Sequence, residues 1–347
     1  GIINIPNSVN QPFYIHSYLQ INPFLFNYNN SPILTYPPID NGCLYKLFIH
    51  NPGAYDPDGD SLSYELALCL GNQCSSVPVQ SFITNLPNGL YYPPNVSVDA
   101  MTGDLIWNVP VPAPNPPFLS TYPQQYNFAM LIKEWRKINN VWYNIGYVER
   151  DLQVDIDNCP NNPPVITTVE DTCVMAGTNL SFQVTATDPD AGDLITLTAT
   201  GGVFTSVTPP ATFTAPGPSL SPVTGTFSWT PTCNQVRNQP YLVLFRAEDN
   251  DTQNPLVDLQ SVLIYVHAPP TVIDSAVPEC NSITLYWDNA PCNPSSNTCI
   301  GYKIYRKNSC DTLSPAPCET DVPSTWGYTL IGTVNGYANT TFNDDNG

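Results

Sequence analysis

The sequence predicts an all-β protein made of tandem β-sandwiches, and three observations lead to this prediction. Short segments such as SFQVTAT, YLVLFRA and ITLYWD alternate apolar with polar residues and are separated by Pro, Gly and Asn, which is typical of sandwich strands. Proline makes up 38 of the 347 residues, and helices tolerate proline only in their first turn. The third observation is an internal repeat, which also makes the segment NFAMLIKEWRK a strand rather than a helix.

Four landmarks of this repeat occur twice in the same order. They are a DPD run, a TG-x-x-x-W segment, a tyrosine followed by an acid eight positions later, and the tripeptide DLQ. The landmarks lie at 56–58, 102–107, 126–134 and 151–153, and again at 188–190, 224–229, 241–249 and 258–260. We therefore expect two homologous sandwich domains, 1–160 and 161–268, joined by a proline-stiffened linker at 155–166.

A different pattern follows the second domain. The segments SITLYWDNAP, GYKIYRK, WGYTLIGTV and TTFNDDNG together resemble a fibronectin type III domain. That family continues with two more strands, so residues 269–347 are expected to form a fibronectin type III-like sandwich that lacks its last strands. Gly1 is not a natural start, and we expect neighbouring domains of a longer chain.

The charge balance restricts the classes of partner. Lys and Arg total 10 against 29 Asp and Glu, which gives a formal charge of −19. Nucleic acids and anionic membrane surfaces are excluded because there is no basic patch to attract phosphate. No stretch approaches the ~18 apolar residues of a membrane span, so no membrane insertion is expected. The balance favours a divalent cation as partner; the alternative is simple solubility through self-repulsion.

Acidic residues gather in turns that the expected strand order places at one end of each domain. With seven alternating strands, the turn after the second strand and the turn after the sixth both lie where the chain enters the domain. Alternate residues of an extended segment point the same way, so Asp-x-Asp aims two carboxylates at one point. Crowded carboxylates repel one another unless they bind a cation or take up protons, and Ca²⁺ binds six to eight oxygens.

The candidate Ca²⁺ ligands fall into two groups. They are Asp56, Asp58, Asp60 and Glu134 in the first domain, and Asp155, Asp157, Asn161, Asp188, Asp190, Asp193, Asp249 and Asp251 around the second. We expect the first group to face whatever precedes Gly1, and the second group to face the linker. The link into the third domain, YVHAPPTV, has no acids, so no ion is expected there. The alternative is that both groups are ordinary acid-rich surface turns.

The linker supports the cation interpretation. The segment VDIDNCPNNPPV resembles the inter-domain linker of cadherin-type sandwiches, although Cys159 and Pro160 interrupt its run of Asn and Asp. This resemblance implies immunoglobulin-like/cadherin-like domains and calcium that rigidifies the junction of the first two.

Eleven cysteines, none in paired Cys-x-x-Cys knuckles, indicate disulfides in an oxidising compartment. The expected pairs are Cys43–Cys159, Cys69–Cys74, Cys173–Cys233, Cys292–Cys299 and Cys310–Cys318, with Cys280 unpaired. The odd count is explained if the partner of Cys280 lies in the strands that the third domain lacks.

Four segments carry a wider resemblance. IPNSVNQPFYIHSYLQINPF, NNSPILTYPPIDNGC, FIHNPGAYDPDGDSLSYEL and GYVERDLQVDI resemble the very large surface and secreted proteins of Bacteroidetes that carry a gliding-motility-associated C-terminal domain. The resemblance implies export across the outer membrane by the type IX secretion system. It also implies a role as a cell-surface adhesin or structural stalk.

No catalytic constellation stands out, so we expect no enzyme. The three histidines have no metal-ligand spacing, and there is no G-x-S-x-G elbow. The first hypothesis is an extracellular structural or adhesive stalk, stapled by disulfides and rigidified by calcium. The second is a carbohydrate-binding accessory region of a secreted hydrolase, with Trp135, Trp142 and Tyr143 as the glycan-binding candidates. The third is passive cargo held by a secretion machine or filament partner, which would cover the open strand edges of the third domain.

Overall fold

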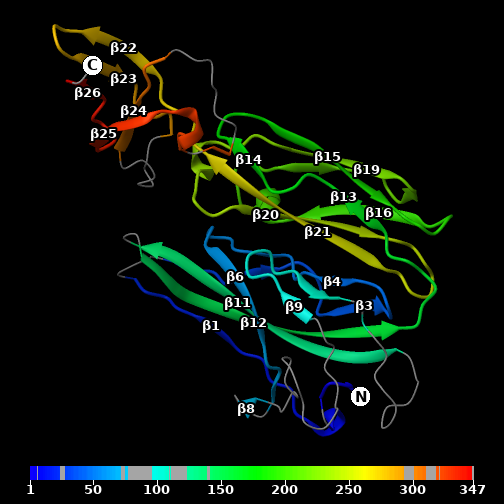
Figure 1. Cartoon of the computed structure of the whole chain (residues 1–347). Helices are drawn as coiled ribbons and strands as arrows, with labels where there is room; N and C mark the ends of the chain where they lie inside the picture. The colour runs from blue at the N-terminus through cyan, green and yellow to red at the C-terminus, as the bar shows by residue number, and fades with distance from the viewer. Residues whose placement is uncertain are drawn as a thin grey trace.

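The computed structural model describes residues 1–5, 7–23, 28–71, 75–76, 96–108, 110, 123–138, 141–292, 301–309, 318–319 and 321–345. Strands dominate these residues, and the all-β prediction is confirmed. The helical elements are single turns: η1 (Ser8–Asn10), α1 (Gly202–Thr205), η2 (Cys233–Gln235) and η3 (Ser324–Trp326). Within the described ranges, no helix is long and apolar enough to cross a membrane. Figure 1 shows the strands arranged as three layered bodies that follow one another along the chain.

The first body packs two sheets face to face. One sheet has the order β1 (Ser17–Leu19), β12 (Val141–Asp157), β11 (Gln124–Ile138) and β6 (Ser61–Ala67), with β3 (Ile39–Cys43) parallel to β12. The other consists of β4 (Phe48–His50), β10 (Leu105–Trp107) and β9 (Val96–Val98). Two short pairs complete it: β2 (Ile33–Leu34) with β5 (Ala54–Tyr55), and β7 (Leu70–Gly71) with β8 (Ser75–Ser76).

The second body repeats this plan more completely. One sheet has the order β13 (Val165–Thr167), β15 (Leu180–Thr187), β19 (Val223–Trp229) and β17 (Thr212–Thr214). The facing sheet has the order β14 (Thr172–Met175), β21 (Val257–His267), β20 (Tyr241–Glu248), β16 (Leu194–Thr200) and β18 (Ser219–Leu220). β14 runs parallel to β21, as β3 does to β12 in the first body.

The third body is smaller. β22 (Ile273–Pro278), β23 (Ile283–Trp287) and β26 (Thr341–Asp344) form one sheet, and β24 (Gly301–Arg306) pairs with β25 (Thr329–Asn335) in the other.

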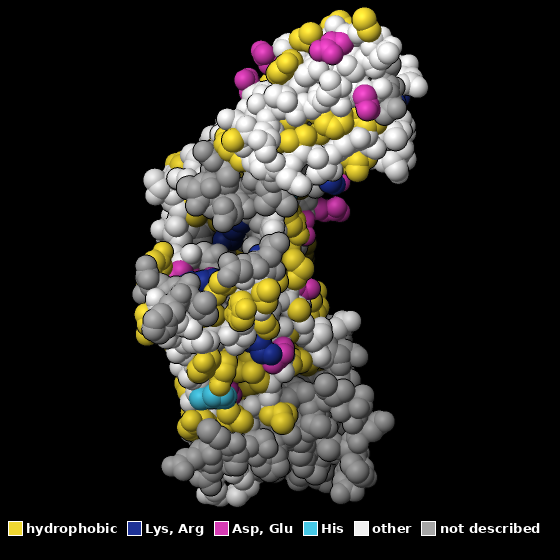
Figure 2. Space-filling model, turned by 90° about the vertical axis from the view of Figure 1, so that its left-hand side faces the viewer, with side chains coloured by type: hydrophobic (Ala, Val, Ile, Leu, Met, Phe, Trp, Pro, Cys, Tyr) yellow, Lys and Arg dark blue, Asp and Glu magenta, His cyan; other side chains and the backbone are white. Residues whose placement is uncertain are grey.

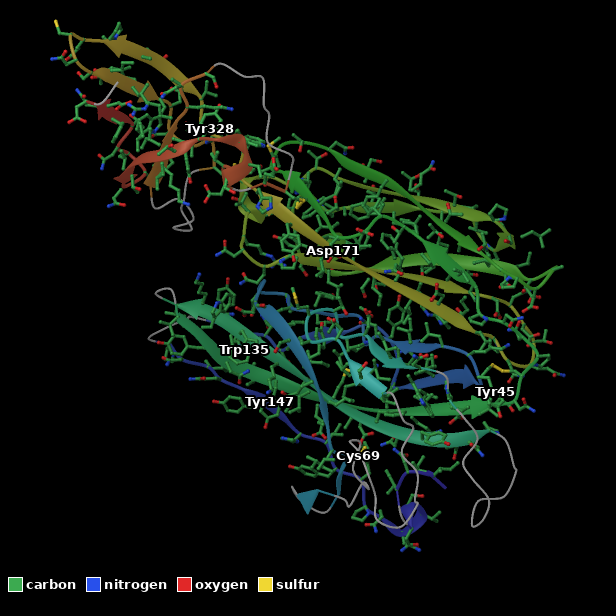
Figure 3. All side chains as sticks on the ribbon, in the orientation of Figure 1. Tyr45, Cys69, Trp135, Tyr147, Asp171 and Tyr328 are labelled. Carbon is green, nitrogen blue, oxygen red and sulfur yellow. A yellow bond between two sulfur atoms is a disulfide. The ribbon has the colours of Figure 1, made fainter. Side chains whose placement is uncertain are left out.

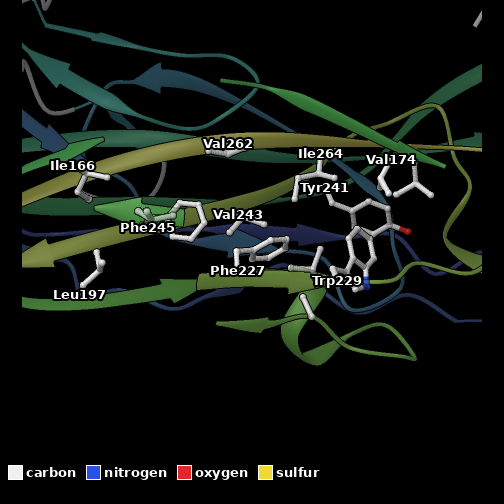
Figure 4. Close-up of a cluster of buried hydrophobic side chains, with 14 of the residues drawn as sticks. Ile166, Val174, Leu197, Phe227, Trp229, Tyr241, Val243, Phe245, Val262 and Ile264 are labelled. Atoms are coloured by element: carbon white, nitrogen blue, oxygen red, sulfur yellow. The ribbon is translucent and has the colours of Figure 1, made fainter. Parts of the chain in front are cut away.

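The alternating pattern of the sequence builds the core of the second body. Val243 and Phe245 on β20, together with Phe227 and Trp229 on β19, are at most 1% exposed. Figure 4 shows these side chains projecting from facing strands into one apolar layer. Because side chains alternate across a strand, one face of each strand supplies the core and the other remains available for contacts.

One aromatic pair recurs in both halves of the repeat. The rings of Trp107 and Tyr126 meet edge to face at 4.9 Å and 76°, and those of Trp229 and Tyr241 do so at 5.1 Å and 76°. The third body has a comparable pair, Trp287 with Tyr302. The first two pairs are the tryptophan and tyrosine landmarks of the sequence repeat, so the repeat extends to side-chain geometry.

The first two bodies lie side by side, because the chain doubles back at the linker (Figure 1). β21 of the second body contacts β4 of the first. Ser261 donates a hydrogen bond to Asp104 (2.9 Å), and Arg237 donates to the carbonyl oxygen of Gly59 (3.1 Å). Leu263 on β21 is 5% exposed although it lies outside the core cluster of its own body, since it lines a cleft shared with the first.

Two disulfides join the second body to the third. Cys173 is bonded to Cys318, and Cys233 to Cys292. The expected pairs Cys173–Cys233, Cys292–Cys299 and Cys310–Cys318 are therefore wrong. The physical reason is that the third body folds against the end of the second, which brings residues 292 and 318 to Cα distances of 5.0 and 5.2 Å from their partners. Cys299 and Cys310 lie outside the described residues.

The remaining cysteines are in the first body and at the far end of the third. Cys43 is bonded to Cys159. Cys69, expected to pair with Cys74, is a free buried thiol, and Cys74 lies outside the described residues. Cys280 is free and exposed.

Replacing Trp229 with Ala should lower the free energy of unfolding of the second body by about 3–5 kcal/mol, because the substitution leaves a cavity in a packed core. The matched control is Trp142→Ala, at a side chain that is 40% exposed, where the loss should be within about 0.5 kcal/mol. Chemical denaturation of both variants measures the difference. Equal losses would contradict the assignment of Trp229 to the core.

Candidate functional site

The acids of the second body converge in the turn between β15 and β16. Asp188, Asp190 and Asp193 each place a carboxylate oxygen within 4.8 Å of the others. The β20–β21 turn brings Asp249 beside them, and the charge of Asp249 helps to raise the pKa of Asp188. Two turns that are far apart in sequence thus meet at the end of the body where the linker enters.

The linker is bonded to both of these turns. The backbone N–H of Asn162 donates to Asp190 Oδ2 (2.6 Å), and its side-chain amide also donates to the same carboxylate. The Asn161 amide donates to Asp249 Oδ2 (2.8 Å) and to the carbonyl oxygen of Asn254 (2.9 Å). These hydrogen bonds fix the path of the chain as it leaves the first body.

Lys46 of the first body holds the other side of the linker. Its ammonium group donates to the carbonyl oxygens of Pro160 and Asn161. Burial lowers the pKa of Lys46, and the nearby charge of Asp190 partly offsets this effect. Sequence reasoning missed Lys46; the one available signal is that it follows Cys43, whose disulfide partner lies in the linker.

The carboxylates of this group are partly buried, and the residues around them do not fully satisfy their charge and hydrogen bonds. Burial raises the pKa values of Asp188 and Asp249 above their usual range, and the other carboxylates add to the effect. Asp188 Oδ2 is buried and has no hydrogen-bond partner within the described part of the chain. Carboxylate and carbonyl oxygens are the ligands that Ca²⁺ prefers. The donor set of Asp188, Asp190, Asp193 and Asp249 therefore fits a hard divalent cation.

Three of the expected ligands are engaged elsewhere. Asp155 accepts a hydrogen bond from the side chain of Gln153 (2.7 Å). Asp157 accepts from the backbone of Asn158, which follows it. Asp251 accepts from two backbone N–H groups of its own turn. The carboxylates of Asp155 and Asp157 are bonded within or directly after strand β12, and that of Asp251 is bonded within its own turn, so these three hydrogen-bond to neighbouring residues and not to the group.

The acids of the first body form a second group. Asp56, Asp58 and Asp60 also place oxygens within 4.8 Å of one another. Arg136 binds both oxygens of Asp60 and lies 3.6 Å from Asp58, which also accepts two hydrogen bonds from Asn30. Sequence reasoning missed Arg136, because nothing local distinguishes it from other strand residues.

From the sequence we expected this first group to face whatever precedes Gly1, and the structure differs. The group faces the second body, where Arg237 contacts Gly59 within the same turn. The cause is the doubling back of the chain, which brings the entry end of the first body beside the far end of the second. Figure 3 shows this separation: Trp135, next to Glu134, and Tyr45, next to Lys46, lie at opposite ends of the first body.

The three aromatic residues expected to bind glycan do not form one platform. Trp135 is partly buried and donates a hydrogen bond to Ser63 (2.8 Å). Trp142 is exposed beneath Lys137, and Tyr143, the next residue of the strand, points to the opposite face. Figure 2 shows the apolar side chains of the face it views gathered in patches, with a few separate charged side chains and a histidine among them.

A third set of acids, which sequence reasoning did not use, lies on the outer face of β12. Glu149 binds the His16 imidazole (2.5 Å), and the Asn127 amide donates to Asp151 and approaches the Cys69 thiol (3.5 Å). Burial raises the pKa of Asp151 to about 7, and the charge of Glu149 adds to the effect. The sequence feature that could have indicated this set is the alternation of acids in the segment VERD, residues 148–151.

Comparisons with known proteins do not identify a family. No protein-family model matches the sequence, and no curated protein matches it. Similar solved structures include the major subunit AggA of the Escherichia coli aggregative adherence fimbriae type I, at 16% identity and a TM-score of 0.25, covering 32% of this chain and 99% of that one. A titin I67–I69 fragment matches at 8% identity and 0.26, covering 91% and 88%. Drosophila N-cadherin EC1-3 matches at 14% and 0.21, covering 62% and 57%. TM-scores this low support no functional inference.

Replacing Asp151 with Asn should flatten the dependence of stability on pH. The folded state holds the Asp151 proton up to about pH 7, whereas the unfolded state releases it near its ordinary pKa of 3.8. The carboxyl group therefore costs stability progressively as the pH rises from about 4 to about 7. Chemical denaturation from pH 4 to pH 8 should show that the free energy of unfolding of the variant rises relative to that of the natural chain as the pH increases. Parallel curves would contradict the burial of an ionisable group there.

Proposed function

We propose that this chain is a rigid structural or adhesive segment of an extracellular protein, in which the sandwich bodies are held in fixed relative positions. The observation that carries this proposal is that each junction is fixed by several contacts. A flexible linker between independent domains would show neither hydrogen bonds along its path nor covalent links across the junction.

At the first junction, the linker is held from both sides. Asn161 and Asn162 are bonded to the turns of the second body, and Lys46 of the first body is bonded to the linker carbonyls. We assign Ca²⁺ to Asp188, Asp190, Asp193 and Asp249. An ion there offsets two of the four negative charges and ties the two turns together, which stiffens the surface on which the linker rests.

At the second junction, covalent links take the place of an ion. Cys173–Cys318 and Cys233–Cys292 attach the third body to the second at two points. Two points of attachment restrict both swinging and rotation of one body against the other. Disulfides persist in oxidising surroundings, which supports an extracellular location.

The remaining parts of the proposal rest on the sequence resemblance. The segments quoted above favour a place on the cell surface after export across the outer membrane by the type IX route. The proposal gives the chain no catalytic role. A carbohydrate-binding role is less well supported, because Trp135, Trp142 and Tyr143 do not share one face.

Calcium should raise the thermal unfolding midpoint of the full chain relative to chelator, since a ligand that binds only the folded state stabilises it by mass action. At a calcium concentration of 100 times the dissociation constant, one site contributes about 2.7 kcal/mol. We call the Ca²⁺ site of Asp188, Asp190, Asp193 and Asp249 the junction site. Asp193→Asn should lose the stabilisation that calcium gives through this site, because the variant lacks one of its carboxylates. Asp193 is the suitable position because its carboxylate makes no hydrogen bond within the described ranges.

The matched control is Asp251→Asn, in the neighbouring turn, where the carboxylate serves backbone N–H groups and an amide oxygen can replace it. This variant should keep the full calcium response. The calcium assignment fails if the natural chain shows no shift at millimolar calcium, or if Asp193→Asn and Asp251→Asn respond alike.

A further inference from the structure

We propose that the first body holds a second divalent-cation site, built by Asp56, Asp58, Asp60 and Glu134 beside the cleft between the first two bodies. The function proposed above needs only the junction site, so this inference goes beyond it. The ligand is a hard cation of the Ca²⁺ class, because every group offered to it is a carboxylate oxygen.

The turn between β5 and β6 gathers three carboxylates at one point. Its oxygens lie within 4.8 Å of one another, and two ligands of one Ca²⁺ ion at about 2.4 Å each are separated by no more than this. Asp56 Oδ1 accepts the backbone N–H groups of Asp58 (2.8 Å) and Asp60 (3.1 Å). Gly59, at φ +84°, allows the tight turn that these bonds close. Asp56 Oδ2 is left buried with no partner in the described part of the molecule.

Glu134 supplies an independent observation that points to a ligand. It follows Phe128, Met130 and Ile132 on the core-facing side of β11 and is itself 0% exposed. Neither of its carboxylate oxygens makes a hydrogen bond of normal geometry among the described residues, and the nearby Asn29 side chain offsets only part of the rise in its pKa that burial causes. A buried carboxylate without a partner is strongly unfavourable. The aspartate turn is close enough for the charges of Asp56 and Asp60 to act on it, so Glu134 lies at the edge of the same group.

Arg136 neutralises only part of this group. Its guanidinium binds Asp60 through two nitrogen atoms and also donates to the carbonyl oxygen of Tyr28 and to Asn29 Oδ1. Four carboxylates therefore lie near two guanidinium groups, because the charge of Arg237 also acts on Asp56 and Asp60 although its hydrogen bond goes to the backbone of Gly59. The oxygens that lack a hydrogen bond of normal geometry are one oxygen of Asp56 (7% exposed) and both oxygens of Glu134. A divalent cation beside Asp56 and Glu134 compensates the negative charge that Arg136 and Arg237 leave, and it supplies a partner for the carboxylate oxygens that neither guanidinium binds.

The cleft gives an ion access and links the site to the second body. It has a volume of about 790 Å³ and is lined by the aspartate turn on one side and by Arg237 and Tyr241 on the other. Arg237 stacks on Tyr241 at 3.6 Å and donates to Gly59 in the middle of the aspartate turn. An ion that fixes this turn therefore also fixes a contact between the two bodies, at the opposite end of the first body from the linker.

Counting bound ions tests the inference. Equilibrium dialysis of the full chain against calcium, followed by elemental analysis, should give two ions per chain. Glu134→Gln should lower this count to one, and Asp193→Asn should lower it to one independently. The double variant should bind none. Glu149→Gln is the matched control, since Glu149 is also a buried glutamate of the same sheet (4% exposed) but is bonded to His16; it should keep two.

A second variant, Asp56→Asn, covers the case in which Glu134→Gln fails to fold, and near-ultraviolet circular dichroism checks each variant. The inference is overturned if folded Glu134→Gln or Asp56→Asn binds as many ions as the natural chain. That result, combined with loss of an ion in Asp193→Asn, would leave the junction site intact. Loss in Glu134→Gln but not in Asp193→Asn would reject the junction site instead.

Discussion

The hydrogen bonds that hold the linker from both sides determine how the first two bodies are arranged. Asn161 and Asn162 are bonded to Asp249 and Asp190 on one side, while Lys46 holds the linker carbonyls on the other. Because the chain is fixed at this point, the second body lies along the first instead of extending beyond it. The cleft and the contact of Arg237 with the aspartate turn are consequences of this one turn of the chain.

The features that were predictable from the sequence are local ones. Alternation places Phe227 and Trp229 on the inner face of a strand, and the order of strands places the turns at 188–193 and 249–256 at one end. The internal repeat leads to the same Trp–Tyr ring pair in two bodies. These relations depend on strand period and turn chemistry, both of which act over a few residues.

The relations that were missed depend on how the bodies pack. In the sequence, nothing distinguishes Leu263 from other strand residues. Only the folded chain shows that its side chain, which points away from the core of its own body, is covered by the first body. The cysteines of the second body were placed at the correct end, but their partners lie in another body, which pairing by sequence proximity does not reveal. Arg136 similarly acquires its role only when β11 lies against the aspartate turn.

The central claim is that the first two bodies form one side-by-side unit. Small-angle X-ray scattering of the full chain in calcium tests this claim most directly. The scattering curve should match the doubled-back arrangement, with the short maximum dimension of two bodies lying in parallel and a third attached at one end. A curve that instead requires three sandwiches in a line, or a spread of inter-body distances, would contradict the account.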